Sequence, residues 1–151
     1  MSTIQARTGP RGELFIEEPE VARYLAIGGT GGGFQLPDPA SGSSDRHMQQ
    51  IHAPGLLSNR APLIFFRTRH TGRPRFSVRL NATHLTQYTF VANDPPERSW
   101  HEIIVTGALK AQDNELVFGV SGDGSVIFGD VVIMYTSNEL TVRKPLVFSP
   151  G

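Results

Sequence analysis

The sequence predicts an all-β protein, a single β-sandwich of about eight to ten mostly antiparallel strands with little or no helix. Short apolar runs recur along the chain, several with the two-residue period of a strand that buries one face. Turn-forming residues separate these runs at intervals of roughly 8–12 residues, as in sandwiches and barrels. Helical periodicity is nearly absent and strands do not alternate with helices, which argues against α/β folds.

The strand pattern is clearest at 76–80, where Phe76, Val78 and Leu80 alternate with polar residues. Tyr88 and Phe90 share a face of the following run. Further β-prone runs lie at 13–16, 63–69, 102–106, 115–120, 125–128, 130–135, 140–143 and 146–148. Glycine-containing turns at 71–74 and 121–124 link neighbouring runs at hairpin distance. The expected core comprises Phe15, Phe65, Phe76, Val78, Leu80, Phe90, Ile104, Leu116, Phe118, Val132 and Met134.

Three segments interrupt this pattern. Residues 18–26 have a proline and two glutamates at the start and fit either one helical turn or a strand. Residues 28–33 contain five glycines and predict a flexible turn or a close approach of another backbone, since no phosphate-loop or dinucleotide motif surrounds them. Residues 36–59 are rich in Pro, Ser, Gly and His and predict an irregular lid, arm or mobile insertion.

The chain of 151 residues has the size of one domain, so residues 1–151 are expected to form a single sandwich. No apolar run approaches the roughly 18–20 residues that a membrane span needs. The absence of cysteine excludes disulfides, thiolate zinc sites and cysteine nucleophiles. Because the first residues show no apolar signal region, a cytoplasmic location is the default expectation, although a processed secreted chain would look the same.

The formal net charge is zero, but the charges are unevenly placed. Residues 1–45 carry three bases and six acids, residues 46–93 carry seven arginines and no acid, and residues 94–151 carry four bases and eight acids, which gives −3, +7 and −4. One interpretation is that the segments pair their charges across the fold. The other is an anion-binding face, for which the candidates are Arg67, Arg69, Arg73, Arg75 and Arg79.

Evidence for catalysis or a metal is weak. The five histidines lack ligand-like spacing, no Gly-x-Ser-x-Gly elbow is present, and the acidic residues lie mostly beside turns or at strand starts. We therefore expect no catalytic residues, no metal site and no cofactor.

The most distinctive polar and aromatic cluster is Arg98, Trp100, His101 and Glu102, which follows a proline-rich loop. Trp100 is the only tryptophan of the chain and fits two roles. It can fill the core at one end of the sandwich, or it can form a stacking platform for a sugar, with the other three residues as hydrogen-bonding partners.

The rhythm of residues 60–140 resembles the galactose-binding-like β-sandwich, the jelly roll shared by many carbohydrate-binding modules. The resemblance is carried by Leu80-Asn81, Leu109-Lys110, Asn114-Glu115-Leu116 and the run from Ile127 to Tyr135, although the family's glycine before the Asn is replaced by Gln112 and Asp113. It implies a jelly-roll topology and a domain that binds sugars, proteins or nucleic acid. Several members hold a structural calcium, but no matching Asp/Asn cluster occurs here. We expect the Asn114 side chain to fix its own turn.

These observations favour a non-catalytic, lectin-like module whose ligand is a carbohydrate. A first alternative is a structural or assembly protein that binds other proteins as a homo-oligomer, with the glycine run and the 36–59 arm exchanging contacts between subunits. A second alternative is a sandwich enzyme acting on a sugar or an anionic substrate, with Arg67, Arg69 and a histidine at its mouth. Neither nucleic acid nor a membrane is an expected partner.

Overall fold

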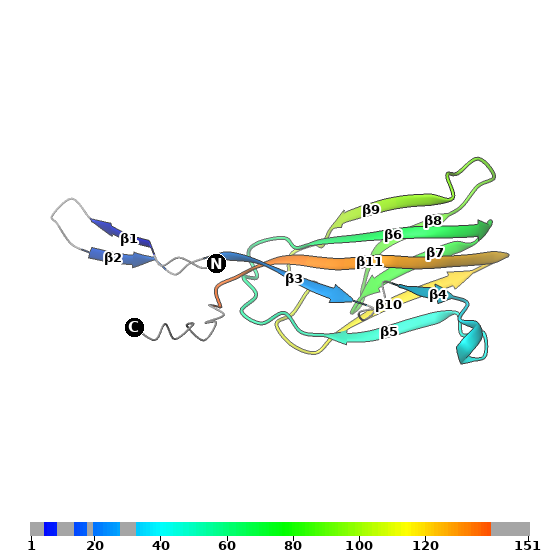
Figure 1. Ribbon diagram of the computed structural model, residues 1–151. Coiled ribbons are helices and arrows are strands. Elements are labelled where there is room, and N and C mark those ends of the chain that lie inside the picture. Colours follow the sequence, from blue (N-terminus) through cyan, green and yellow to red (C-terminus); the bar gives the residue numbers. More distant parts are fainter. Residues whose placement is uncertain (1–4, 9–13, 18–19, 28–32, 140–151) are drawn as a thin grey trace, which may run out of the picture.

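Two antiparallel sheets lie face to face in the computed structural model of the chain (Figure 1), which describes residues 5–8, 14–17, 20–27 and 33–139. The five-stranded sheet has the order β3–β11–β6–β9, with β4 pairing along β11. Its strands are β3 (Val21–Ile27), β4 (Phe34–Leu36), β6 (Leu63–Gly72), β9 (Glu97–Ile103) and β11 (Gly124–Ser137).

The second sheet has four strands in the order β5–β10–β7–β8. These are β5 (Arg46–Ile51), β7 (Arg75–Leu80), β8 (Thr83–Thr89) and β10 (Asn114–Ser121). A separate hairpin of β1 (Gln5–Thr8) and β2 (Leu14–Glu17) pairs with neither sheet. A single 3₁₀ turn, Pro39–Ser41, is the only helical element within the described residues.

The pairing of the eight main strands is nested, as in a long hairpin folded over on itself. β3 pairs with β11, β5 with β10, β6 with β9 and β7 with β8, so the first strand meets the last and the fourth meets the fifth. This is the arrangement of a jelly roll, which the sequence predicted. The predicted all-β class and antiparallel sandwich are confirmed.

Aromatic rings fill the space between the sheets. The Phe66 and Phe76 rings lie edge to face with centroids 5.9 Å apart, and Phe118 and Phe128 lie 5.0 Å apart. Seven of the predicted core residues are buried, namely Phe76, Val78, Leu80, Phe90, Ile104, Leu116 and Phe118. Burying side chains of this size stabilises the fold by roughly 1.5–3 kcal/mol each.

Three core predictions are wrong because the runs concerned are apolar on both faces. Phe65 is exposed because Ile64 and Phe66, its neighbours on β6, face inward. Val132 and Met134 are only half-buried, and the residues between and beside them face the core. A β-bulge between Gly129 and Val132 shifts the register of β11 against β6 and reverses the phase of the strand. The side chain of Phe15 lies outside the described residues.

Before β6 the structure decides between two alternatives and corrects one prediction. Residues 21–27 form strand β3, which is the strand alternative and not the helical turn. Residues 36–59 are not irregular throughout, because they include β5, which pairs with β10 over six residues. The sequence does not indicate β5, because its inner face carries the polar residues His47 and Gln49 and its outer face carries only one apolar residue, Met48.

Two other predictions fall largely beyond the described part of the chain. The runs at 140–143 and 146–148 lie outside it, as does the glycine run except for Gly33. A Cβ atom at Gly33 would lie 2.5 Å from the carbonyl oxygen of Phe128, so the backbones of β4 and β11 approach closely there.

A pair of asparagines, of which Asn114 is buried and Asn81 half-buried, joins the loops at one end of the four-stranded sheet. The Asn114 amide donates to the carbonyl oxygens of Lys110 (2.6 Å) and Ile51 (3.2 Å), and its Oδ1 accepts from the Lys110 N–H (2.7 Å). The Asn81 Nδ2 also donates to Asn114 Oδ1 and to the Ala108 carbonyl oxygen. The predicted role of Asn114 in fixing its own turn is confirmed, and the same side chain also ties β5 to β10.

Replacement of Asn114 by alanine is expected to lower the free energy of unfolding by roughly 2–4 kcal/mol, because buried backbone groups lose their partners. Urea denaturation of the full chain measures this change. The matched control is Asn138→Ala, at an exposed position whose side chain makes no hydrogen bond within the described residues. Equal midpoints for the two variants would show that the asparagine pair contributes no more than a surface residue.

Candidate functional site

Trp100 lies in the core. Its side chain is 9% exposed, its indole Nε1 donates to the Thr68 hydroxyl at 2.9 Å, and its ring packs edge to face against Phe76 with centroids 5.0 Å apart. The hydrogen bond to Thr68 satisfies the single polar atom of the indole, which a buried tryptophan requires. Of the two roles that the sequence left open, the position of Trp100 fits the core-filling one.

Arg98 covers the side of Trp100 that would otherwise face solvent. Its guanidinium lies 4.0 Å from the Trp100 ring centroid and 5.0 Å from that of Tyr88, which are distances of cation–π contacts. The Tyr88 hydroxyl in turn donates to the carboxylate of Asp94 at 2.9 Å. The aromatic surface is therefore occupied by side chains of the protein itself.

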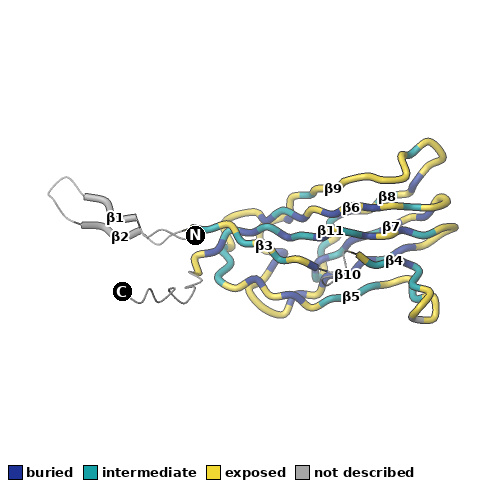
Figure 2. Tube along the Cα trace, viewed as in Figure 1, coloured by how far each residue is buried: buried dark blue, intermediate teal, exposed yellow. Residues whose placement is uncertain are grey.

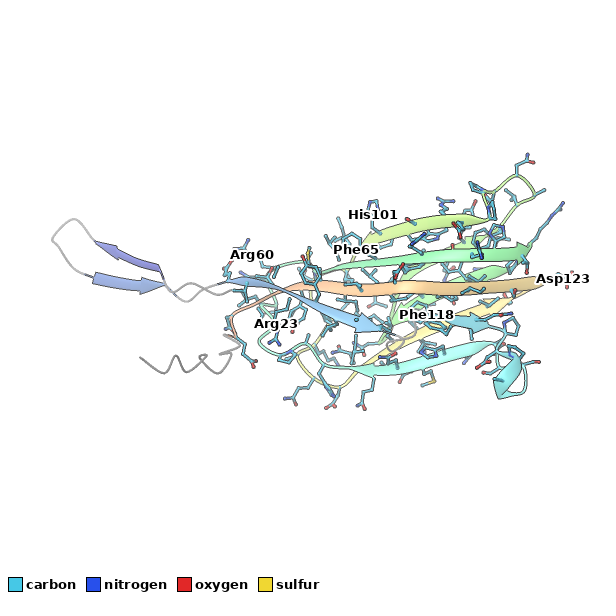
Figure 3. All side chains as sticks on the ribbon, in the orientation of Figure 1. Arg23, Arg60, Phe65, His101, Phe118 and Asp123 are labelled. Atoms are coloured by element: carbon cyan, nitrogen blue, oxygen red, sulfur yellow. The ribbon has the colours of Figure 1, made fainter. Side chains whose placement is uncertain are left out.

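The sandwich separates the four residues of the predicted sugar site. His101 points to the outer face of the five-stranded sheet, where its ring lies 6.4 Å from that of Phe65 (Figure 3). Trp100 points into the core, and Glu102 is half-buried in the same alternation. Arg98 lies against Trp100 at the rim. No single surface presents all four side chains.

The predicted arginine cluster is also divided between the two sheets. Arg67 and Arg69 lie on the outer face of the five-stranded sheet and pair with Asp130 (3.2 Å) and Glu97 (2.8 Å), where they line a shallow groove of about 250 Å³. Arg75 begins β7 in the other sheet, and Arg73 lies in the turn before it. The turn at 72–74 thus moves the chain from one sheet to the other between Arg69 and Arg75.

The ion pairs within the described residues join the basic middle segment to the two acidic segments. Besides Arg67 and Arg69, Arg60 pairs with Glu20 at 2.7 Å and Arg79 with Glu115 at 3.7 Å. The expectation that the segments pair their charges across the fold is confirmed for these four arginines. All four pairs are exposed, so each contributes at most about 1 kcal/mol to stability.

The outer face of the five-stranded sheet carries apolar side chains, and three of them, Phe65, Val132 and Met134, are residues that the sequence predicted to lie in the core. The strand register places two rows of residues side by side across β3, β11, β6 and β9. We define the outer apolar patch as the seven apolar residues of these rows, with Tyr24, Met134, Leu63 and Ile103 in one row and Ala26, Val132 and Phe65 in the next, which ends at His101.

This patch is open to solvent at its centre and both edges. Tyr24 is 65% exposed, Ile103 70% and Phe65 39%, and Figure 2 shows exposed positions along β9 at the edge of the sheet. The sequence did contain a signal for it. The runs 63–66 and 131–134 are apolar without alternation, which is typical of strands that are covered on both faces.

The described residues contain neither a metal-binding group of side chains nor a membrane-spanning helix. The described residues contain no group of three or more His, Asp or Glu that could hold a metal ion. His47 and His70 are stacked on Phe34 and Phe90, with ring centroids 4.0 and 3.7 Å apart. Within the described ranges, no helix is long and apolar enough to cross a membrane.

Comparison of the sequence with known protein families finds no matching family, and comparison with curated proteins finds no match either.

The hydrogen bonds of Asp94 give the protein a local pH dependence. The Val91 N–H donates to the carboxylate at 2.7 Å and lowers the pKa of Asp94 below its ordinary value of 3.8, with Tyr88 and Arg98 acting in the same direction. Because the folded-state pKa is the lower one, this stabilisation is complete above about pH 4 and is lost as the pH falls through the folded-state pKa.

The free energy of unfolding is expected to fall more steeply with acidification below about pH 4 in the native protein than in Asp94→Asn. Urea titrations at a series of pH values measure the two slopes. The other carboxylates are common to both chains, so the difference isolates Asp94. Parallel slopes would contradict the assignment.

Proposed function

We propose that the protein is a non-catalytic β-sandwich module that self-associates through the outer face of its five-stranded sheet. The observation that carries this proposal is the outer apolar patch, which spans four strands and includes three large side chains that are 39–70% exposed. Contiguous apolar surface of this kind marks protein–protein interfaces, whereas single exposed apolar residues do not. Its aromatic residues Tyr24 and Phe65 belong to the types enriched at the centre of interfaces.

The size of the face suits an interface between proteins. Four strands spaced about 4.8 Å apart and the seven residues of β6 that pair with β9, at about 3.4 Å each, give a surface of roughly 19 by 24 Å. This is roughly 460 Å² of flat area, compared with the roughly 800 Å² of accessible surface that each partner contributes to a stable complex. Side chains that project from the sheet add to this flat area.

The charges favour a second copy of this chain as the partner. Next to the outer apolar patch the charged residues form internal pairs, Arg67 with Asp130 and Arg69 with Glu97. The chain as a whole has a net charge of zero. Two such faces therefore meet without like-charge repulsion, and neither offers an unbalanced charge that would select a different partner of opposite sign.

The route to assembly differs from the one that the sequence suggested. Residues 46–51 form β5 within the four-stranded sheet and are not a free arm that could be exchanged. The proposal therefore rests on a sheet face that each subunit presents already formed.

The other two functions have less support from the geometry. Carbohydrate binding at residues 98–102 stays a prediction, but Trp100 is buried beneath Arg98 and the four residues do not share a surface. The enzyme alternative requires a histidine beside Arg67 and Arg69. Within the described residues, no histidine lines the groove that contains these two arginines.

Replacing Ile103 by arginine is expected to raise the dissociation constant of the homo-oligomer at least about tenfold, because the variant must bury an unpaired charge. Sedimentation velocity over a range of protein concentrations measures the change. The matched control is Met48→Arg, which places the same charge at a position of similar exposure (60% against 70%) on the outer face of the other sheet.

The control variant is expected to sediment like the native protein. A native chain that stays monomeric at all concentrations would contradict the proposal. So would equal dissociation by the Ile103 and Met48 substitutions, because the effect would then arise from added charge and not from the patch.

A further inference from the structure

The four-stranded sheet carries a second groove on the opposite side of the molecule from the outer apolar patch. It has a volume of about 170 Å³ and is lined by Arg46, Arg75, Ser77, Gly119 and Ser121, together with Asp45, Phe76 and Val120. Strands β5, β10 and β7 lie side by side here, with Gly119 between Arg46 on one neighbouring strand and Ser77 on the other. Because Gly119 has no side chain, the floor of the groove is open between the two arginines.

The two arginines of this groove differ from those on the other sheet in having no acidic partner. Within the described residues, neither Arg46 nor Arg75 forms an ion pair, whereas Arg67 and Arg69 each do. Arg75 donates to the Gln87 side-chain oxygen at 2.9 Å, and the Gln87 amide lies 3.2 Å from His84 Nδ1. A neutral amide thus holds the Arg75 guanidinium in place without cancelling its charge, which prepares it for an anion.

The lining also contains two serine hydroxyls that make no internal hydrogen bond within the described residues. The hydroxyls of Ser77 and Ser121 have no hydrogen-bond partner among the described residues, and the two apolar residues, Phe76 and Val120, are buried beneath the floor. Asp45 contributes its carbonyl oxygen to the backbone N–H of Val120. The lining therefore has two arginine side chains, two hydroxyl groups and the exposed Asp45, so it carries a net charge of +1 (two bases and one acid).

We infer that this groove binds the carboxylate of a sugar acid, such as a uronic-acid residue in an acidic polysaccharide. A guanidinium pairs with a carboxylate through two parallel hydrogen bonds, and the serine hydroxyls can donate to and accept from neighbouring sugar hydroxyls. The small volume suits one charged sugar and not a large apolar ligand. A phosphate also accepts two parallel hydrogen bonds from a guanidinium, so binding of tripolyphosphate is the competing outcome of the test.

This inference goes beyond the proposed self-association and does not depend on it. The groove lies on the sheet that the proposed interface leaves free, so each subunit of an oligomer would present one groove. Several grooves on one assembly would bind a repeating polysaccharide more tightly than a single subunit does.

Titration calorimetry of the full chain with short probes tests the site. The probes are trigalacturonate and a hyaluronan hexasaccharide as uronates, maltotriose as a neutral sugar, and tripolyphosphate as a phosphate. At least one uronate is expected to bind at least tenfold more tightly than maltotriose and more tightly than tripolyphosphate. Failure of both uronates to bind overturns the inference. So does a result in which maltotriose or tripolyphosphate binds more tightly than both uronates.

The double variant Arg46→Gln/Arg75→Gln is expected to weaken uronate binding at least tenfold. The matched control, Arg60→Gln/Arg73→Gln, removes the same charge from exposed arginines that do not line the groove and is expected to change it less than twofold. The two control arginines lie at opposite ends of the sandwich. Figure 3 shows Arg60 at one end and Asp123 at the other, and the Arg73 N–H donates to the carbonyl oxygen of Asp123. Equal losses in the two double variants overturn the site, because charge alone would explain them.

The same titration on Ile103→Arg separates this inference from the proposed function. Binding of the short uronate by one groove is expected to be unchanged in that variant whether or not the native chain assembles. A loss of short-uronate binding in Ile103→Arg while its thermal stability is retained would contradict a site that is complete within one subunit.

Discussion

Strand β11 holds the sandwich together, because it pairs with three other strands. This 14-residue strand from the second half of the chain pairs with β3, β4 and β6 from the first half. It therefore lies at the centre of the five-stranded sheet. The bulge between Gly129 and Val132 reverses which of its side chains face the core. Before the bulge Val126 and Phe128 point inward, and after it Val131, Ile133 and Tyr135 do.

The bulge also determines the outer surface. Because Val131 and Ile133 turn inward, Val132 and Met134 are placed on the outer face beside Leu63 and Phe65 of β6. The two edge strands complete the rows with Tyr24 and Ile103. A continuous two-residue alternation along β11 would instead have placed Val132 and Met134 in the core, with different side chains on the face that we propose as an interface.

The two outer faces of the sandwich differ in chemistry. The outer face of the five-stranded sheet carries the outer apolar patch and, beside it, arginines paired with acids, which suits contact with an identical face. The outer face of the four-stranded sheet carries the groove, in which Arg46 and Arg75 have no acidic partner within the described residues. This difference arises because the turn between β6 and β7 carries the basic segment from one sheet to the other. Arginines that are close in sequence therefore serve separate surfaces.

The extent to which the sequence predicted this structure follows from how clearly each strand alternates. Strand β7 alternates strictly, and its inward residues were identified correctly. The local role of Asn114 was also predictable, since an asparagine before a strand commonly fixes its own turn. In contrast, the apolar runs of β6 and β11 have no alternation from which the buried face could be chosen. The bulge of β11 begins at Gly129, between the runs 125–128 and 130–135, so a glycine inside the strand was the available signal for it. The cover that Arg98 provides over Trp100 depends on the packing of side chains from β8 and β9, which no local pattern encodes.

Carbene footprinting of the native chain, with each residue's labelling normalised to that of the unfolded protein, measures whether the outer apolar patch becomes covered when the protein self-associates. Tyr24, Phe65 and Ile103 on the outer apolar patch are compared with Met48, which is 60% exposed on the other sheet. Self-association through the patch predicts that labelling of the three patch residues falls as protein concentration rises, while that of Met48 stays constant. Patch residues that label in proportion to their exposure at every concentration, as Met48 does, would contradict it.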